Sequence, residues 1–104
     1  MRNLTLQLTD PHYNHRDQMI FYEAFSDART FPCGIHLYTL RDSFSVALNP
    51  NDVAGSAIDG FRANHDAIRD LTRKKILSCD FEPDGSILIE SSDAPNPGIR
   101  YRVG

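Results

Sequence analysis

Apolar and polar side chains alternate along residues 4–8 and 30–38. Alternation with a period of two is typical of a strand with one buried face, and it predicts a strand over each stretch. Residues 19–25, which lie between them, are rich in aromatic and branched side chains, and this predicts another strand. Residues 10–15 contain proline, aspartate and asparagine, which favour a loop between the first two strands. Residues 26–28 are predicted to form the turn of a hairpin between the second strand and the third.

The period changes after residue 38. Thr39 is a predicted helix N-cap, and the pattern after it indicates a short helix over residues 40–48 that ends at Asn49 and Pro50. Farther along, apolar side chains recur every three or four positions, which predicts one long amphipathic helix over residues 56–78.

The last quarter of the chain returns to short extended segments. Residues 82–85 read Glu-Pro-Asp-Gly, a combination that favours a turn, and a strand is predicted over residues 86–90. Two prolines interrupt regular structure at residues 94–98. Residues 99–103 alternate again, which is compatible with an edge strand or an extended tail.

Three strands, two helices and a final strand predict an α+β fold in two layers, with a mostly antiparallel sheet and both helices on one face. Because Pro32 cannot donate a hydrogen bond to a ladder, the third strand is predicted to be an edge strand or to contain a bulge. The sheet face toward the helices is predicted to carry Leu4, Leu6, Phe31, Cys33, Ile35, Ile87 and Ile89. The opposite face is predicted to carry Thr5, Gln7, Tyr22, Gly34, His36 and Tyr38.

The composition is that of an ordinary globular domain, with 104 residues, of which 40% are hydrophobic and 24% charged. We expect residues 1–93 to form a single domain and residues 94–104 to form a tail or edge strand. The sequence shows no secretory signal and no apolar run of membrane-spanning length, so a cytoplasmic location is expected. Cys33 and Cys79 are then expected to be free thiols.

Two short spacings resemble halves of a zinc site, His12 with His15 and Cys33 with His36. Residues three apart on a strand point to opposite faces, so Cys33 and His36 could share an ion only across a bulge. We therefore expect no metal site and no cofactor.

Catalytic motifs are also missing from the sequence. It contains no Gly-x-Ser-x-Gly elbow, no phosphate-binding glycine loop and no dinucleotide fingerprint. His65 and Cys79 would be about 21 Å apart on one continuous helix, too far for a nucleophile and its base. No catalytic residue is assigned, and the chain is not expected to be an enzyme.

Three stretches carry a resemblance to a known family: the strand pair MIFYEAF and FPCGIHLYTL, the helical FRANHDAIRDLTRKKI, and FEPDGSILIESSD. Through them, residues 19–93 resemble the domain of unknown function 1488 family of small proteobacterial proteins. The resemblance implies a small α+β fold. It implies no activity, catalytic residue or cofactor, and it does not extend to the residues after Asp93.

Protein binding is the function that the residues favour. Tyr22, His36 and Tyr38 are predicted to lie together on the uncovered sheet face, and tyrosine is common in protein interfaces. The sequence therefore predicts a protein-binding module that self-associates, serves as an accessory subunit or inhibits another protein.

Nucleic-acid binding is the alternative. Arg69, Arg73, Lys74 and Lys75 lie on the predicted long helix and could contact phosphates. Acidic residues are interleaved with them, which is typical of a solvated helix surface, and the net charge of -3 opposes binding to a polyanion.

Overall fold

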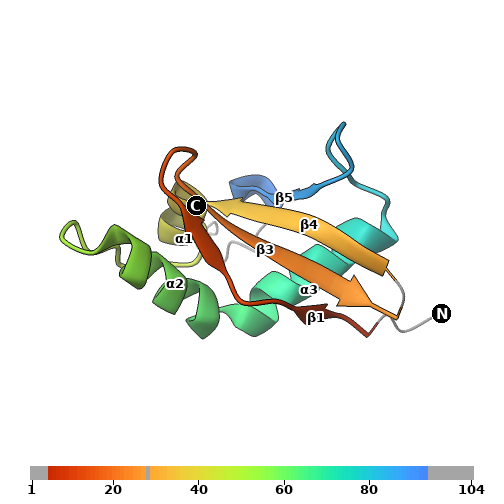
Figure 1. Cartoon of the computed structure of the whole chain (residues 1–104), viewed down its shortest axis with the longest axis horizontal. Coiled ribbons are helices and arrows are strands. Elements are labelled where there is room, and N and C mark those ends of the chain that lie inside the picture. The colour runs from red at the N-terminus through yellow and green to blue at the C-terminus, as the bar shows by residue number, and fades with distance from the viewer. Residues whose placement is uncertain (1–4, 28, 94–104) are drawn as a thin grey trace, which may run out of the picture.

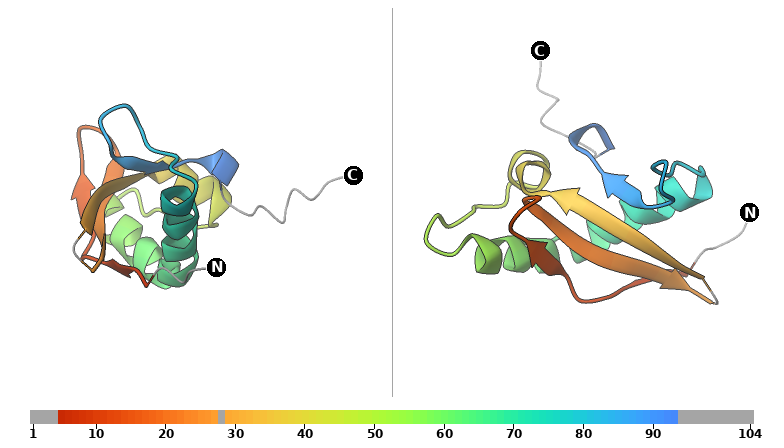
Figure 2. Two further views of the ribbon diagram at one scale, coloured as in Figure 1. Left: turned by 90° about the vertical axis from the view of Figure 1, so that its right-hand side faces the viewer. Right: turned by 45° about the horizontal axis from the view of Figure 1, so that its top comes forward.

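The computed structural model describes residues 5–27 and 29–93 of the chain. Its strands are β1 (Gln7–Leu8), β2 (His12–Asn14), β3 (Met19–Ser26), β4 (Arg29–His36) and β5 (Ile87–Ile89). Its helices are α1 (Leu37–Ser43), α2 (Val53–Ala63) and α3 (His65–Leu77), and a 3-10 turn, η1 (Ser91–Asp93), follows β5. The strands form one sheet, and the helices pack against one of its faces (Figures 1 and 2). The predicted α+β class is confirmed.

A long antiparallel hairpin of β3 and β4 forms the centre of the sheet, with Ser26 opposite Arg29 and Met19 opposite His36. β1 and β2 pair one after the other with the other edge of β3, both antiparallel. Residues 12–14, predicted to be part of a loop, therefore extend the sheet, and the first strand is shorter than predicted.

β5 pairs with β4 in the parallel direction, so the sheet is mixed. All three helices lie between β4 and β5 in the chain and provide the long crossover that a parallel pair requires. β4 is consequently an interior strand over Cys33–Ile35 and not an edge strand along its length, and its register with β3 runs through Pro32 without the alternative bulge. The pairing with β5 begins at Cys33, so β4 has no ladder partner on that side at Pro32.

The core lies between the sheet and the helices. Buried side chains from the sheet include Leu6, Ile20, Tyr22, Ala24, Phe31, Cys33, Ile35, Ile87 and Ile89. This confirms the predicted helix-facing residues, apart from Leu4, which lies outside the described residues. From the helices, Leu40, Ala57, Phe61, Ile68 and Leu71 complete the core.

The first helix begins earlier than predicted and ends earlier too. β4 runs directly into α1, and the backbone N–H of Leu37 donates to the carbonyl of Gln18 in the turn before β3. After the helix, Ser45 takes a positive φ of 57°, which is incompatible with a continuing helix. Val46 then packs into the core from an irregular segment.

The predicted long helix is two helices that meet at Asn64. The φ and ψ of this residue, -110° and 21°, lie outside the helical range, and its side-chain amide donates to the carbonyl of Gly60 at 2.9 Å. Asparagine competes in this way with regular helical hydrogen bonds. The break lets α2 and α3 take different directions across the sheet (Figure 1).

Within the described residues, each helix falls short of the length and hydropathy needed to cross a bilayer. The predicted tail over residues 94–104 lies outside the described part of the chain.

Candidate protein-binding surface

The sheet face turned away from the helices, called the open face below, has an apolar centre. Met19 and Phe21 of β3 lie on it, because the residues that alternate with them point into the core. Their cross-strand partners in β4 are His36 and Gly34. Phe21 is 36% exposed, and Phe25, on the same face of β3, is 37% exposed.

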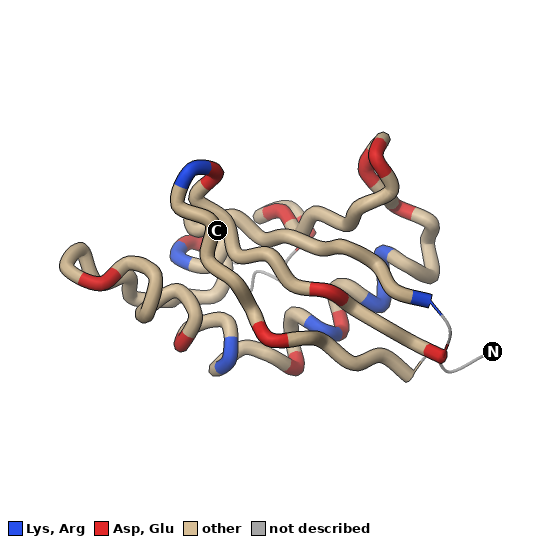
Figure 3. The backbone as a smooth tube through the Cα atoms, viewed as in Figure 1, with Lys and Arg blue, Asp and Glu red and all other residues tan. Residues whose placement is uncertain are grey.

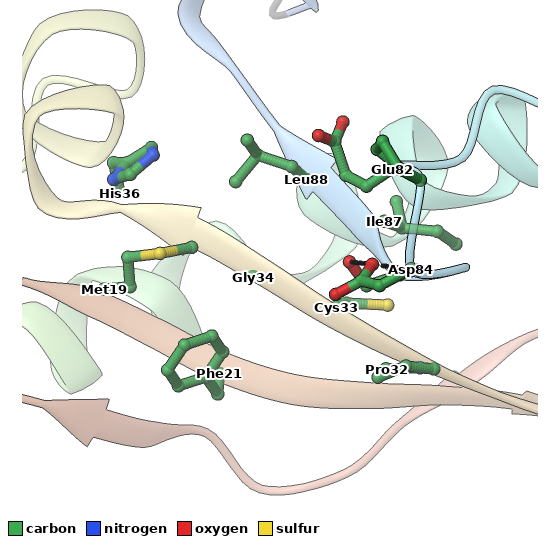
Figure 4. A pocket seen from close by; sticks show the side chains of 12 residues that line it. Met19, Phe21, Pro32, Cys33, Gly34, His36, Glu82, Asp84, Ile87 and Leu88 are labelled. Carbon is green, nitrogen blue, oxygen red and sulfur yellow. Dashed lines mark hydrogen bonds between the residues drawn. The ribbon is translucent and has the colours of Figure 1, made fainter. Parts of the chain in front are cut away.

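A groove of about 580 Å³ runs across this face over β3, β4 and β5 (Figure 4). Met19 and Phe21 line it on one side and Leu88 of β5 on the other. The loop between α3 and β5 rises beside it and contributes Glu82 and Asp84. We call this feature the open-face groove; it combines an apolar interior with an acidic rim.

Gly34 keeps the floor of the groove low. A Cβ atom at this position would lie 2.6 Å from Met19 Cε and 3.4 Å from the ring of Phe21. Any larger residue would therefore displace Met19 or fill the space between the two walls. The glycine thus allows the side chains of Met19 and Phe21 to lie close to the β4 backbone.

The charges around the groove are negative. Asp84 Oδ1 accepts hydrogen bonds from the Ser86 hydroxyl at 2.6 Å and from its backbone N–H at 2.9 Å, and these bonds lower the pKa of Asp84. The carboxylate therefore stays ionised at neutral pH. A second hollow on the other side of Phe21 is lined by Asp10 and Glu23. In the described part of the chain, no lysine or arginine lines either hollow, and Figure 3 shows acidic positions along this face.

His36 and Tyr38 lie at one end of the groove, as a stacked pair of rings. Their centroids are 4.6 Å apart and the planes differ by 11°. His36 ends β4 and lines the groove, whereas Tyr38 belongs to α1 and lines the next hollow, with Tyr13 and Arg41. The prediction that Tyr38 lies on a strand is wrong, but its side chain is 49% exposed, as a binding residue requires.

Tyr22 is not on the open face, and this prediction is wrong. Its side chain is 3% exposed on the helix side, where the ring packs against Phe61 with 4.9 Å between centroids. Its hydroxyl lies 2.8 Å from Thr72 Oγ1. Burial raises the pKa of Tyr22, and the nearby Cys33 adds to this effect. Tyr22 therefore belongs to the core, and the neighbouring Phe21 takes the exposed position.

The basic residues of α3 are not a free cationic surface. Arg69 lies 3.6 Å from Asp66, and Arg73 lies 3.0 Å from Asp70, each pair three residues apart on the helix. Such pairs are weak, but they reduce the positive potential of the surface. Lys74 is exposed.

Lys75 is buried, with its side chain 10% exposed, and it joins two segments that are far apart in the sequence. Its ammonium group lies 3.0 Å from Asp93 of η1 and 3.4 Å from Asp80. Burial lowers the pKa of Lys75, but the hydrogen bond and charge of Asp93, together with Asp80, outweigh it and raise the pKa. Lys75 thus anchors η1 to α3 and is not positioned to contact nucleic acid.

The two cysteines are free thiols, Cys33 buried and Cys79 exposed. Burial raises the pKa of the Cys33 thiol to about 12, so this group is not a nucleophile near neutral pH. Among the described residues, no group of three or more His, Cys, Asp and Glu side chains is arranged to hold a metal ion.

Comparison of the sequence with family models gave no match, and neither did comparison with curated proteins. Comparison of the structure with solved structures gave a match. The chain is similar to the crystal structure of a protein of unknown function from Shewanella loihica PV-4, a member of the DUF1488 family, with a TM-score of 0.74. The chain has the fold of that DUF1488 protein. The match covers 86% of this chain and 97% of the other at 19% identity, so the resemblance predicted from the sequence is confirmed for the fold.

Proposed function

We propose that this chain is a cytoplasmic protein-binding module, without catalytic activity, whose open face receives a short segment of another protein. The open-face groove is the observation that supports the proposal. It leaves Phe21, Met19 and Leu88 partly in water on a face that the helices do not cover. Covering these side chains with an apolar group of a partner would be favourable, because it removes apolar surface from water.

The groove favours a protein segment over nucleic acid. Phosphates would meet the carboxylates of Glu82 and Asp84, and the cations of α3 lie in the helix layer on the opposite side of the sheet. Two of these cations are paired and Lys75 is buried. Nucleic-acid binding therefore stays the weaker alternative, with Lys74 as its exposed contact.

The test uses random peptides displayed on phage. Peptides retained by the full-length protein are selected, and their affinities are then measured for the parent and for Phe21→Ala. We expect Phe21→Ala to weaken binding by about tenfold or more, as loss of a central aromatic anchor usually does. Leu77→Ala is the matched control, because Leu77 is a large apolar side chain that is 52% exposed on α3.

Circular dichroism checks that both variants stay folded. Selected peptides should also shift the NMR signals of Gly34 and Leu88 in the parent protein. Equal affinities for the parent and Phe21→Ala would contradict the proposal, as would signal shifts confined to α2 and α3. Failure to select any peptide would count against it as well.

A further inference from the structure

We infer that the segment bound in the open-face groove is basic as well as apolar, with a lysine or arginine next to the side chain that enters the groove. This inference rests on the proposed function and names the chemistry of its partner. It follows from the position of the carboxylates relative to the apolar interior of the groove, which Figure 4 shows.

The interior of the open-face groove is apolar. Met19, Phe21 and Leu88 line the groove around Gly34, which has no side chain. An apolar group placed there would remove these side chains from water, which is favourable. The interior therefore selects an apolar side chain.

The rim of the open-face groove is acidic. Glu82 and Asp84 belong to the loop that flanks the same groove, and hydrogen bonds from Ser86 orient the Asp84 carboxylate and lower its pKa. The adjacent hollow adds Glu23 and Asp10 on the other side of Phe21. A segment lying across Phe21 would therefore have carboxylates on both sides of its apolar anchor. Complementary charges attract such a segment, and an acidic segment would be repelled.

The carboxylates around the groove are not paired with cations of the described residues. Salt bridges of the described residues engage other carboxylates, those of Asp42, Asp66, Asp70, Asp80 and Asp93. None of them involves the four carboxylates around Phe21. Their charge in the described part of the chain is thus available to a ligand.

Three synthetic peptides of one length and one apolar anchor test the inference, with lysine, glutamine or glutamate beside the anchor. Affinities are measured by fluorescence anisotropy with the full-length protein. We expect the lysine peptide to bind about tenfold more tightly than the glutamine peptide, because an exposed ion pair contributes up to about fivefold and two carboxylates flank the site. The preference should shrink between about 0.1 M and about 1 M salt, since the Debye length falls from about 10 to about 3 Å.

The combined variant Glu82→Gln with Asp84→Asn identifies the source of the preference. Asparagine keeps the oxygen that accepts from Ser86, so the turn is retained. We expect this variant to reduce the preference for the lysine peptide, with Glu23 and Asp10 accounting for what remains. Asp59→Asn, an exposed carboxylate on α2, is the matched control and should leave the preference unchanged.

The outcomes separate the two proposals. If all three peptides bind equally and Phe21→Ala weakens each of them, the groove binds apolar segments but the inference about charge is overturned. A glutamate peptide that binds more tightly than the lysine peptide overturns it too. If none of the peptides binds, both the inference and the proposed function fail.

Discussion

The buried hydroxyl pair of Tyr22 and Thr72 is expected to be energetically coupled, and the direction of each hydrogen bond can be derived. Thr72 Oγ1 lies 2.8 Å from the carbonyl of Ile68 and 2.8 Å from the Tyr22 hydroxyl. Thr72 has one hydroxyl hydrogen, which it donates to Ile68, so Tyr22 must donate to Thr72. Both side chains are buried, at 3% and 0% exposed, and no exchange with bulk water compensates a lost partner.

The two single substitutions therefore differ in cost. Tyr22→Phe removes the donor and its hydroxyl together, and should lower the free energy of unfolding by about 1 kcal/mol. Thr72→Val keeps the shape but removes the oxygen that accepts from the buried Tyr22 hydroxyl, which should cost about 2 kcal/mol. The double variant replaces both polar groups by apolar ones and should cost about 1 kcal/mol or less.

Urea unfolding followed by far-UV circular dichroism measures all four proteins, and the chain has no tryptophan to serve as a fluorescence probe. The expected coupling energy is about 2 kcal/mol, well above the roughly 0.5 kcal/mol seen for independent sites. If the costs of the single substitutions simply add in the double variant, the hydrogen bond between the two hydroxyls does not stabilise the protein and the reasoning is refuted.

Three further predictions concern other buried contacts. Gly60→Ala should lower the free energy of unfolding by about 1–2 kcal/mol in urea, because the clash of its Cβ with Val46 outweighs the gain in helix propensity; a more stable variant would contradict this. Lys75→Met should cost about 1–3 kcal/mol at neutral pH by leaving Asp93 unpaired. The pKa of Lys75 is raised in the folded state, so this cost should persist at pH values below the unfolded-state pKa of about 10.4 and shrink as the pH rises through the folded-state pKa. A difference between the urea curves that does not depend on pH would exclude the ion pair as its cause. Iodoacetamide at about pH 8 should label the exposed cysteine and spare Cys33, whose pKa is about 12, as peptide mass mapping would show.

The alternation in β3 explains why the sequence predicted the sheet but misplaced the site. Each set of alternate residues in this strand contains large apolar or aromatic side chains and one polar residue, Glu23 in one set and Ser26 in the other, so hydrophobicity alone separated the two faces poorly. The decision depends on partners from elsewhere: Tyr22 lies opposite Cys33 in the register with β4, and its hydroxyl finds Thr72 on α3. The clearest available signal was Glu23, which shares the face of Phe21, because an unpaired glutamate is rarely buried.

The helices were also predicted only in part from the sequence. The recurrence of apolar residues every three or four positions was visible in the sequence, and Phe61 and Ile68, which belong to this pattern, lie in the core. The break between them depends on one asparagine whose side chain bonds to the backbone of the preceding turn. The parallel direction of β5 was beyond local patterns altogether, because it depends on how three helices return the chain to the sheet.

That crossover has a kinetic consequence. Ser26 and Arg29 close the β3–β4 hairpin across a short turn, whereas Ile35 and Ile89 meet only after all three helices have folded back. Contacts of such long sequence separation carry a large loop-closure cost and are expected to form late. Short, late-forming β5 would then exchange its amide hydrogens sooner than the hairpin. Because β5 is also one wall of the groove, occupancy by a ligand should slow hydrogen exchange at Ile87–Ile89 first and thereby stabilise the last part of the sheet to assemble.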